Sequence, residues 1–376
     1  MSNRGFSRRR FLKQVAAGSS AAALGTGLSS AQEVRSGTPP RSPVTVTSYP
    51  VVEAKGATAS RQLKIVSRLE IPQTYQERIL SLSPSLKLKV CPAEEEFQRE
   101  VSDAQVLYGS LSREDLARAK QLAWIQYQAA GVENILWPEL VASPIVLTNM
   151  QRIYAPAISE TAIGLLLALT RGINRYALQT HDHLWQPLRG LNEISGLTMG
   201  IVGLGGIGTD TAYRAHYGFN MRILAVDPKP IPKPAFVAEL HSPDWLPTMV
   251  PQVDVLVSAA PHTPVTQGMF NESVFRAMKP SAYFINVSRG KLVDPPALLR
   301  ALREGWIAGA GLDVTHEEPL PSDDPLWSAP HVIITCHTSG QSPLVLGRQM
   351  DLFTENVRRY VAGLPLLNVV DKKRGY

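Results

Sequence analysis

Cysteine and long hydrophobic runs are both scarce in this chain of 376 residues, and each shortage excludes a class of protein. Two cysteines, Cys91 and Cys336, are too few for a small disulfide-stapled fold. We expect both to be free thiols, and a bridge between them in an oxidising compartment is the alternative. Apolar stretches such as residues 162–169 are too short to cross a bilayer, so the sequence predicts no stable membrane span. The length and a hydrophobic fraction of 44% instead fit a globular protein of two domains.

Acidic side chains are missing from residues 1–31, although this segment carries five lysines and arginines. Within it, residues 7–13 read SRRRFLK, which resembles the twin-arginine motif of bacterial signal peptides, and a mildly apolar stretch with small residues follows. We therefore expect residues 1–31 to be a twin-arginine signal peptide that exports the protein to the periplasm. The alternative is a disordered basic tail on a cytoplasmic protein. Residues 32–60, rich in proline, serine and threonine, predict a flexible linker.

Excess positive charge is scarce beyond that segment. The formal net charge is +6, and the five cations of residues 1–31 account for all but about +1 of it. No basic stripe and no run of interleaved basic and aromatic residues follows. The sequence therefore predicts no nucleic acid as partner.

Short apolar runs alternate with amphipathic stretches from Leu63 onward. Strands that alternate with helices are typical of a parallel sheet, so the first unit is predicted to be an α/β domain. Its expected strands are residues 63–67, 86–90, 104–108, 123–127 and 145–148. Its expected helices are residues 73–82, 94–101 and 112–120. A long apolar helix over residues 156–183 is expected to lead into a second unit.

A glycine-rich motif marks the start of that second unit. Gly203, Gly205 and Gly208 form a G-x-G-x-x-G pattern directly after the apolar run 199–202, and a helix-compatible stretch follows. The first glycine allows a tight turn, the second lets backbone N–H groups approach a pyrophosphate, and the third lets the helix pack on the strand. Asp227 ends the next apolar run, 19 residues after Gly208, where a carboxylate can bind ribose hydroxyls. The combination predicts dinucleotide binding at a helix N-terminus.

The second unit is predicted to be a doubly wound parallel sheet of the Rossmann type, with its ligand at the carboxyl ends of the strands. Its expected strands are residues 198–202, 221–226, 253–258, 282–286, 307–312 and 332–335. Its expected helices are residues 207–217, 271–277 and 295–304. A last helix over residues 344–362 would return to the first unit. The predicted domains are a NAD-binding domain of residues 156–340 and a smaller, discontinuous, flavodoxin-like substrate domain of residues 61–155 and 341–376.

Three further segments place polar residues at or after predicted strand ends. They are residues 286–290 (NVSRG), 312–321 (LDVTHEEPLP) and 335–340 (TCHTSG). With the glycine motif, they resemble the D-isomer-specific 2-hydroxyacid dehydrogenases, and the resemblance extends from about residue 63 to the end. The string GIVGLGGIG and the closing LNVVD look most like the glyoxylate/hydroxypyruvate reductase branch. Cys336 departs from the family pattern, which usually has proline before the catalytic histidine.

The resemblance implies hydride transfer between NAD(H) and a small 2-keto or 2-hydroxy acid, and the chemistry of the residues agrees. Arg289 suits a clamp on the substrate carboxylate, because a guanidinium can pair with it through two hydrogen bonds. His337 suits the proton donor to the carbonyl oxygen, because histidine changes charge near neutral pH. Glu318 would orient His337 and completes the implied catalytic trio.

The family pattern also implies binding residues. Those for the cofactor are Gly203, Gly205, Gly206, Ile207, Gly208, Asp227, Val287, Asp313, His337 and Gly340, with Asp313 on the nicotinamide side. Those for the substrate are Tyr108, Gly109, Gly131 and Arg289, the first three through nearby backbone N–H groups. The pair His181 and His183 has no further clustered ligands, so no metal is expected.

NAD is expected in preference to NADP, because Asp227 would repel a 2′-phosphate, although Lys229 weakens this repulsion. The resemblance implies a homodimer. A non-catalytic NAD-binding sensor or interaction protein on the same fold is the alternative. The presence of Arg289, Glu318 and His337 favours the enzyme.

Overall fold

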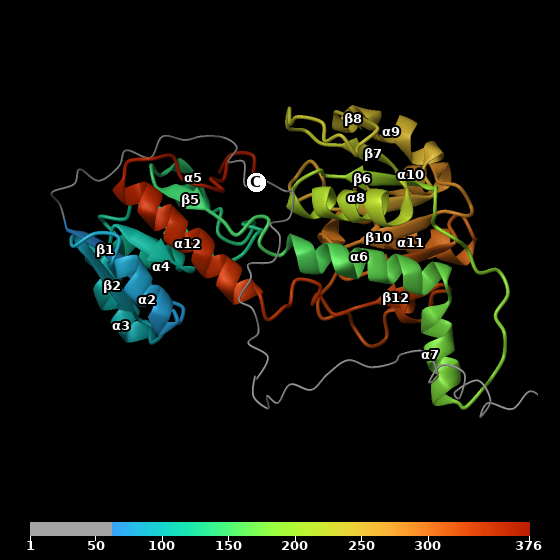
Figure 1. The fold of residues 1–376 in the computed structure, drawn as a ribbon, viewed down its shortest axis with the longest axis horizontal. Helices are drawn as coiled ribbons and strands as arrows, with labels where there is room; N and C mark the ends of the chain where they lie inside the picture. The colour runs from blue at the N-terminus through green and yellow to red at the C-terminus, as the bar shows by residue number, and fades with distance from the viewer. Residues whose placement is uncertain (1–61) are drawn as a thin grey trace, which may run out of the picture. The chain divides into compact units, whose positions relative to one another are not determined.

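The computed structural model describes residues 62–376, and the predicted signal peptide and linker lie outside them. This part of the chain forms two parallel sheets, sheet A and sheet B, with helices packed on each (Figure 1). The predicted α/β class with two parallel-sheet domains is confirmed. Within residues 62–376, every helix is too short or too polar to cross a bilayer.

Sheet A has the flavodoxin-like strand order β2-β1-β3-β4-β5. Its strands are β1 (Leu63–Ser67), β2 (Leu86–Val90), β3 (Val106–Tyr108), β4 (Trp124–Gln126) and β5 (Val146–Thr148). Its helices are α2 (Gln73–Leu80), α3 (Glu94–Glu100), α4 (Arg113–Arg118), α5 (Pro138–Ala142) and α12 (Val345–Val361). The first two strands agree with the sequence prediction to the residue, whereas β3, β4 and β5 are one or two residues shorter.

Helix α12 packs on sheet A, although it comes from the far end of the sequence (Figure 1). Phe353 of α12 stacks on Tyr108 with ring centroids 4.6 Å apart, and Tyr360 stacks on Trp124 at 5.3 Å. Beyond the helix, Val369 pairs with Thr148 at the edge of the sheet. Sheet A and the helices packed on it, called the first lobe here, are therefore built from two separate stretches of sequence.

Sheet B has seven parallel strands in the order β12-β11-β10-β9-β6-β7-β8, the doubly wound arrangement predicted from the sequence. Its strands are β6 (Thr198–Val202), β7 (Arg222–Val226), β8 (Glu239–His241), β9 (Val255–Ser258), β10 (Tyr283–Asn286), β11 (Gly309–Leu312) and β12 (Val332–Ile334). The helices around it are α6 (Ala155–Thr170), α7 (Ile173–His181), α8 (Gly206–Phe219), α9 (Leu246–Met249), α10 (Glu272–Ala277) and α11 (Pro295–Arg303). The sequence missed the short edge strand β8, whose three residues are not buried.

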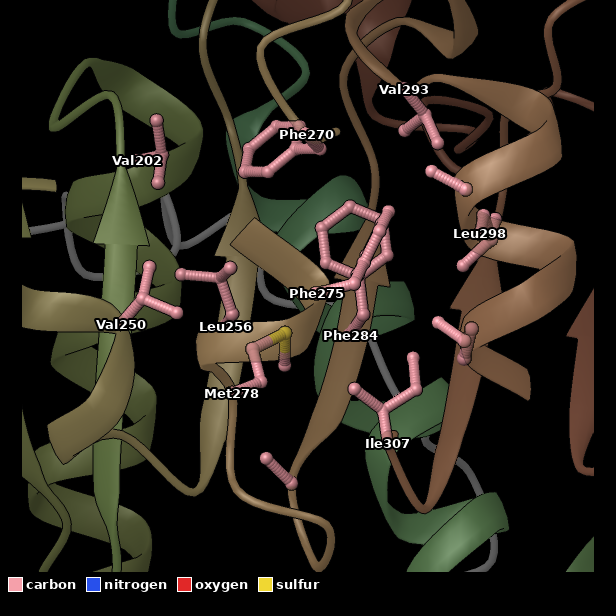
Figure 2. Packing of buried hydrophobic residues seen from close by; sticks show 14 of the residues in the cluster. Val202, Val250, Leu256, Phe270, Phe275, Met278, Phe284, Val293, Leu298 and Ile307 are labelled. Atoms are coloured by element: carbon pink, nitrogen blue, oxygen red, sulfur yellow. The ribbon is translucent and has the colours of Figure 1, made fainter. Parts of the chain in front are cut away.

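Two hydrophobic clusters cover the two faces of sheet B. Helices α6 and α8 pack on one face with Val255 and Val257, and α9, α10 and α11 pack on the other with Leu256, as the alternation of side chains along a strand requires (Figure 1). Figure 2 shows Phe284 of β10 meeting Phe275 of α10, and their ring centroids lie 5.3 Å apart. Burial on both faces fixes the strand register, and hence the loops at the strand ends. Sheet B with α6 to α11 is called the second lobe.

The single helix predicted over residues 156–183 is wrong, because the structure has two helices there. Helix α6 ends at Thr170, and α7 begins at Ile173 in a different direction (Figure 1). Gly172 between them adopts the left-handed conformation (φ +63°), which ends a helix and which glycine adopts without steric cost. Helix α7 has no buried residue.

Candidate functional site

The glycine-rich loop follows β6 and leads directly into α8. Gly203 has φ +93°, and a side chain there would lie 2.8 Å from the backbone of Ala260. A side chain on Gly208 would meet the Gly203 carbonyl oxygen at 2.0 Å, whereas the space in front of Gly205 is open to 3.7 Å. Because no side chain caps the start of α8, its first N–H groups face that space. The loop therefore fits a dinucleotide pyrophosphate.

Asp227 lies directly after β7 and is fixed against this loop. Its carboxylate accepts hydrogen bonds from the backbone N–H groups of Leu204 and Lys229, both at 2.8 Å. Burial raises the pKa of Asp227 above its ordinary value of 3.8, against the opposing effects of these two bonds and of the Lys229 charge. The carboxylate thus stands beside the phosphate loop, where the ribose of a bound dinucleotide is expected.

A buried carboxylate builds the turn that carries His337. Asp313, directly after β11, accepts hydrogen bonds from the Thr335 hydroxyl (2.6 Å) and from the backbone N–H groups of Thr338 (3.1 Å) and Ser339 (3.2 Å). The His337 N–H donates to the Asp313 carbonyl oxygen at 2.8 Å, and His337 itself has φ +54°. These bonds offset the strain of a left-handed backbone at a residue other than glycine. A contact between Asp313 and the nicotinamide stays a prediction.

Glu318 holds the ring of His337, as the sequence predicted. One carboxylate oxygen lies 2.7 Å from His337 Nδ1, and the other accepts a hydrogen bond from the Thr315 N–H at 3.1 Å. The pairing leaves Nε2 for a substrate. His337 lines a cavity of about 830 Å³, a size that suits a small ligand beside part of a cofactor.

Arg289 lines the same cavity. Asn286, the last residue of β10, shapes the loop that presents it, because its side chain donates to the Arg289 carbonyl oxygen and accepts from the Ser288 N–H. The Arg289 Nε lies 2.5 Å from Glu133, a residue of the first lobe. Burial alone would raise the pKa of Glu133, but the charge and hydrogen bond of Arg289 outweigh it and lower the pKa below 4.5.

The structure brings only part of the predicted substrate set to this cavity. Gly131 lines it, and a side chain there would collide with the Arg289 guanidinium at 2.0 Å. Tyr108 and Gly109 do not line it. The Tyr108 ring is buried against Phe353, and the Gly109 N–H donates to the Gln126 carbonyl oxygen at 3.0 Å. Both residues lie at a strand end, as the sequence predicted, but the Gly109 N–H and the Tyr108 ring are already engaged within the first lobe.

The other residues that line this cavity include some that the sequence predicted and some that it did not. Ile207, Val287 and Gly340 were predicted for the cofactor and lie here, and Ile207 connects the cavity to the glycine-rich loop. Sequence reasoning missed Tyr154, Ile158, Leu346 and Gln349. The Gln349 amide donates to the Tyr154 hydroxyl at 2.7 Å, which ties α12 to the start of α6. No local motif marks these residues, because they meet only when the end of the chain packs on the first lobe.

The cysteines add no disulfide, and the prediction of free thiols is confirmed. Cys91 is buried in the first lobe, whereas Cys336 is exposed next to His337. In the part of the chain that the structure describes, no three histidine, cysteine, aspartate or glutamate side chains gather in a way that could hold a metal ion.

Comparisons with known proteins agree with this geometry. The family model described as D-isomer specific 2-hydroxyacid dehydrogenase, NAD binding domain, matches residues 163–339. A glyoxylate reductase of Korarchaeum cryptofilum is 33% identical over 293 residues, which are 75% of this chain and 87% of that protein.

Solved structures are also similar. A D-isomer specific 2-hydroxyacid dehydrogenase family protein of Aeromonas salmonicida is 31% identical with a TM-score of 0.71, and the match covers 83% of this chain and 99% of that one. The NADPH-dependent glyoxylate/hydroxypyruvate reductase of Sinorhizobium meliloti, in complex with NADP and sulfate, is 26% identical with a TM-score of 0.71. That match covers 84% of this chain and 100% of the other.

Proposed function

Because this chain belongs to the D-isomer-specific 2-hydroxyacid dehydrogenase family, we propose that it reduces glyoxylate, hydroxypyruvate or a similarly small 2-keto acid with NADH. It is an oxidoreductase that transfers a hydride from small hydroxy acids or to the corresponding keto acids, the chemistry of its relatives. The observation that supports the proposed substrate most directly is that Arg289 and His337 line one cavity. That pair supplies one cation for a carboxylate and one proton donor for the neighbouring carbonyl.

The proposed mechanism assigns a task to each side chain. When bound, the reduced nicotinamide supplies the hydride. Arg289 holds the substrate carboxylate and in doing so exchanges or shares its bond to Glu133. His337 gives a proton from Nε2 to the carbonyl oxygen, and Glu318 acts as a positioning residue through Nδ1.

The proposed domain division follows the same assignment. Residues 156–340 form the NAD-binding domain, and residues 61–155 with 341–376 form the substrate domain. The packing of α12 against sheet A supports the discontinuous substrate domain.

A screen for NADH oxidation across small 2-keto acids at neutral pH tests the substrate proposal. We expect glyoxylate or hydroxypyruvate to give the highest kcat/KM, because the cavity must also hold the nicotinamide. Binding of NADH without its oxidation by any of these acids would instead favour a non-catalytic sensor.

We propose NAD rather than NADP as the preferred cofactor. The support is Asp227, whose carboxylate is fixed beside the glycine-rich loop. A 2′-phosphate near it would meet like charge, at a cost of about 1–4 kcal/mol. Fluorescence titration with NADH and NADPH measures the preference, and tighter binding of NADPH would refute it.

We further propose a homodimer that forms through α7 and the segment after it. This region exposes large apolar side chains on the surface of the second lobe, which a second copy would cover. They are Ile173, Leu178, Leu184 and Trp185. Light scattering on the purified protein should give twice the chain mass, and Leu178→Asp with Trp185→Ala should give the monomer. A wild-type monomer would refute the proposal.

Export to the periplasm through the twin-arginine route is proposed from the sequence of residues 1–31. Because this route carries folded proteins and free NADH is expected to be scarce outside the cytoplasm, we propose that the cofactor is retained and recycled between two substrates. Cell fractionation with mass spectrometry of the periplasmic protein tests both points. Protein found only in the cytoplasm, or consistently without nucleotide, contradicts them.

A further inference from the structure

A closed turn formed by residues 371–376, called the 371–376 turn here, reaches from the first lobe to the cofactor side of the second. Two bonds close it, from the Gly375 N–H to the Asp371 carbonyl oxygen (2.8 Å) and from the Asp371 N–H to the Tyr376 carbonyl oxygen (3.2 Å). The Asp371 carboxylate also accepts hydrogen bonds from the backbone N–H groups of Lys373 and Arg374, both at 3.0 Å. These hydrogen bonds fix the backbone conformation of the 371–376 turn.

One lysine anchors the turn to the first lobe. The Lys372 ammonium donates to the carbonyl oxygens of Leu140, Ser143 and Ile145 at 2.6–2.9 Å. Burial lowers the pKa of Lys372, so these three carbonyls take over the role of water around the ammonium. An anchor of this kind fixes where the rest of the turn points.

The tip of the turn meets the second lobe next to Asp227. The Lys229 ammonium lies 4.5 Å from the centre of the Tyr376 ring, a cation–π geometry. Burial raises the pKa of Tyr376, so the ring stays a neutral phenol. The charge of Arg374 lowers this pKa, whereas the charges of Asp227 and Asp371 raise it further. A side chain on Gly375 would contact Leu136 of the first lobe and Thr263 of the second, each at 3.8 Å.

The position of the Lys229 ammonium matters for Asp227. The backbone N–H of Lys229 donates to the Asp227 carboxylate. The Lys229 charge also lowers the pKa of Asp227, yet among residues 62–376 its ammonium forms no ion pair with that carboxylate and lies over the Tyr376 ring. An ammonium paired with Asp227 would neutralise the carboxylate, which would then bind ribose hydroxyls less well and repel a 2′-phosphate less.

We propose that Tyr376 determines cofactor selectivity by holding the Lys229 ammonium away from Asp227. The inference rests on the proposed function in taking Asp227 as the group that faces the adenosine ribose. With the ammonium held by the Tyr376 ring, the Asp227 carboxylate stays available to the 2′- and 3′-hydroxyls of the ribose. Its negative charge then repels a 2′-phosphate. Selectivity for the dinucleotide thus depends on a residue from the opposite lobe.

The test compares Tyr376→Ala with Tyr376→Phe, which keeps the ring face but lacks the hydroxyl. Dissociation constants for NADH and NADPH are measured by fluorescence titration without a keto acid, so the result does not depend on turnover. In Tyr376→Ala the NADPH-to-NADH ratio of dissociation constants should fall about five- to tenfold, because the released Lys229 ammonium can form a direct ion pair with Asp227. Tyr376→Phe should keep the wild-type ratio.

A double variant separates selectivity from a simple loss of contact. In Tyr376→Ala with Lys229→Ala, no ammonium remains to neutralise Asp227, so the ratio should return toward the wild-type value. An unchanged ratio in Tyr376→Ala, an equal weakening of both dinucleotides, or no recovery in the double variant overturns the inference. A wild-type preference for NADPH would refute only the proposed cofactor, because the inference is read from the change in the ratio between variants.

Discussion

In the first lobe, polar side chains at the strand ends are buried and form hydrogen bonds with other parts of the same lobe. In the second lobe, by contrast, the polar side chains that follow the strands include residues that line a cavity. Thr148 of β5 accepts from the Trp124 indole at 2.8 Å and donates to the Gln126 amide oxygen at 2.9 Å. In the second lobe, Arg289 and His337 stand in loops just beyond β10 and β12 and face the cavity.

The polar groups of the first lobe serve to join its two stretches of sequence. The Asn356 side chain on α12 donates to the Gln126 amide oxygen at 2.9 Å and exchanges two bonds with the backbone of Leu367, at 2.8 and 3.1 Å. A buried amide with all these partners fixes where α12 and the segment after it dock.

One architecture thus supports two uses of a strand end. In the first lobe, the polar and buried residues at the ends of β4 and β5 hold the lobe together. In the second lobe, Asn286 at the end of β10 shapes the loop that presents Arg289. Asp313, which follows β11, holds the turn after β12 that presents His337. Substitutions at four residues, with one control, test this division.

The largest effect is expected at His337. His337→Asn should lower kcat about 10²–10⁴-fold, because it removes the proton donor while the dinucleotide loop is untouched. Stopped-flow measurement of NADH oxidation gives the rate, and fluorescence titration should show NADH binding close to wild type. Turnover near the wild-type value would contradict the proposed role of His337 as proton donor and would weaken the distinction between the two lobes.

Arg289→Ala should follow. Loss of a charged, two-pronged contact with the substrate carboxylate should lower kcat/KM about 10–150-fold. Arg289→Lys should recover only part of this, because an ammonium cannot reproduce the planar fork. Steady-state kinetics on glyoxylate measure both variants, and an unchanged KM and kcat in Arg289→Ala would contradict the clamp.

Asn356→Ala should destabilise the first lobe without altering the chemistry. It removes one of the two bonds to the Gln126 amide oxygen and both bonds to the backbone of Leu367, so we expect a free energy of unfolding lower by about 2–4 kcal/mol. Glu355→Ala is the matched control on the same helix, because its ion pairs are partly exposed and worth about 1 kcal/mol or less. Urea unfolding measures the difference, and kcat/KM of the folded variant should stay at the wild-type level. Equal stability losses in the two variants would argue against the buried network as the joint.

The smallest effect concerns the contact between Arg289 and Glu133. The pKa of Glu133 is lowered from 4.5 in the folded protein, so its ion pair stabilises the fold above that pH and the contribution is lost as the pH falls through the folded-state value. Melting temperatures from pH 6 to pH 3 should therefore decline less steeply below about pH 4.5 in Glu133→Gln than in the wild type. Parallel curves would mean that the pair contributes nothing to stability.

Much of the fold could be predicted from the sequence, because its signals are local. Apolar runs bounded by polar stretches located β1, β2 and β6 to the residue, and the glycine spacing located the loop before α8. The sequence missed the break at Gly172 because the flanking residues are compatible with a helix. It missed β8 because a short edge strand without buried residues carries no apolar run.

The candidate site divides in the same way. Residues that act through their own chemistry, such as His337 and Glu318, were marked by their type and motif and were found 2.7 Å apart. Tyr108 and Gly109 stay predictions as substrate residues and do not line the cavity, and the sequence cannot show that Gln126 and Phe353 already engage them.

The sequence by itself determined which groups are present: a phosphate loop after a strand, an acid 19 residues later, and a histidine, an arginine and a glutamate for the chemistry. Only the tertiary structure decided which of them meet. The contacts of Arg289 with Glu133 and of Lys229 with Tyr376 join residues more than a hundred positions apart. Such pairs depend on how two separately packed sheets and a returning helix come together, and no periodicity or spacing along the chain records that.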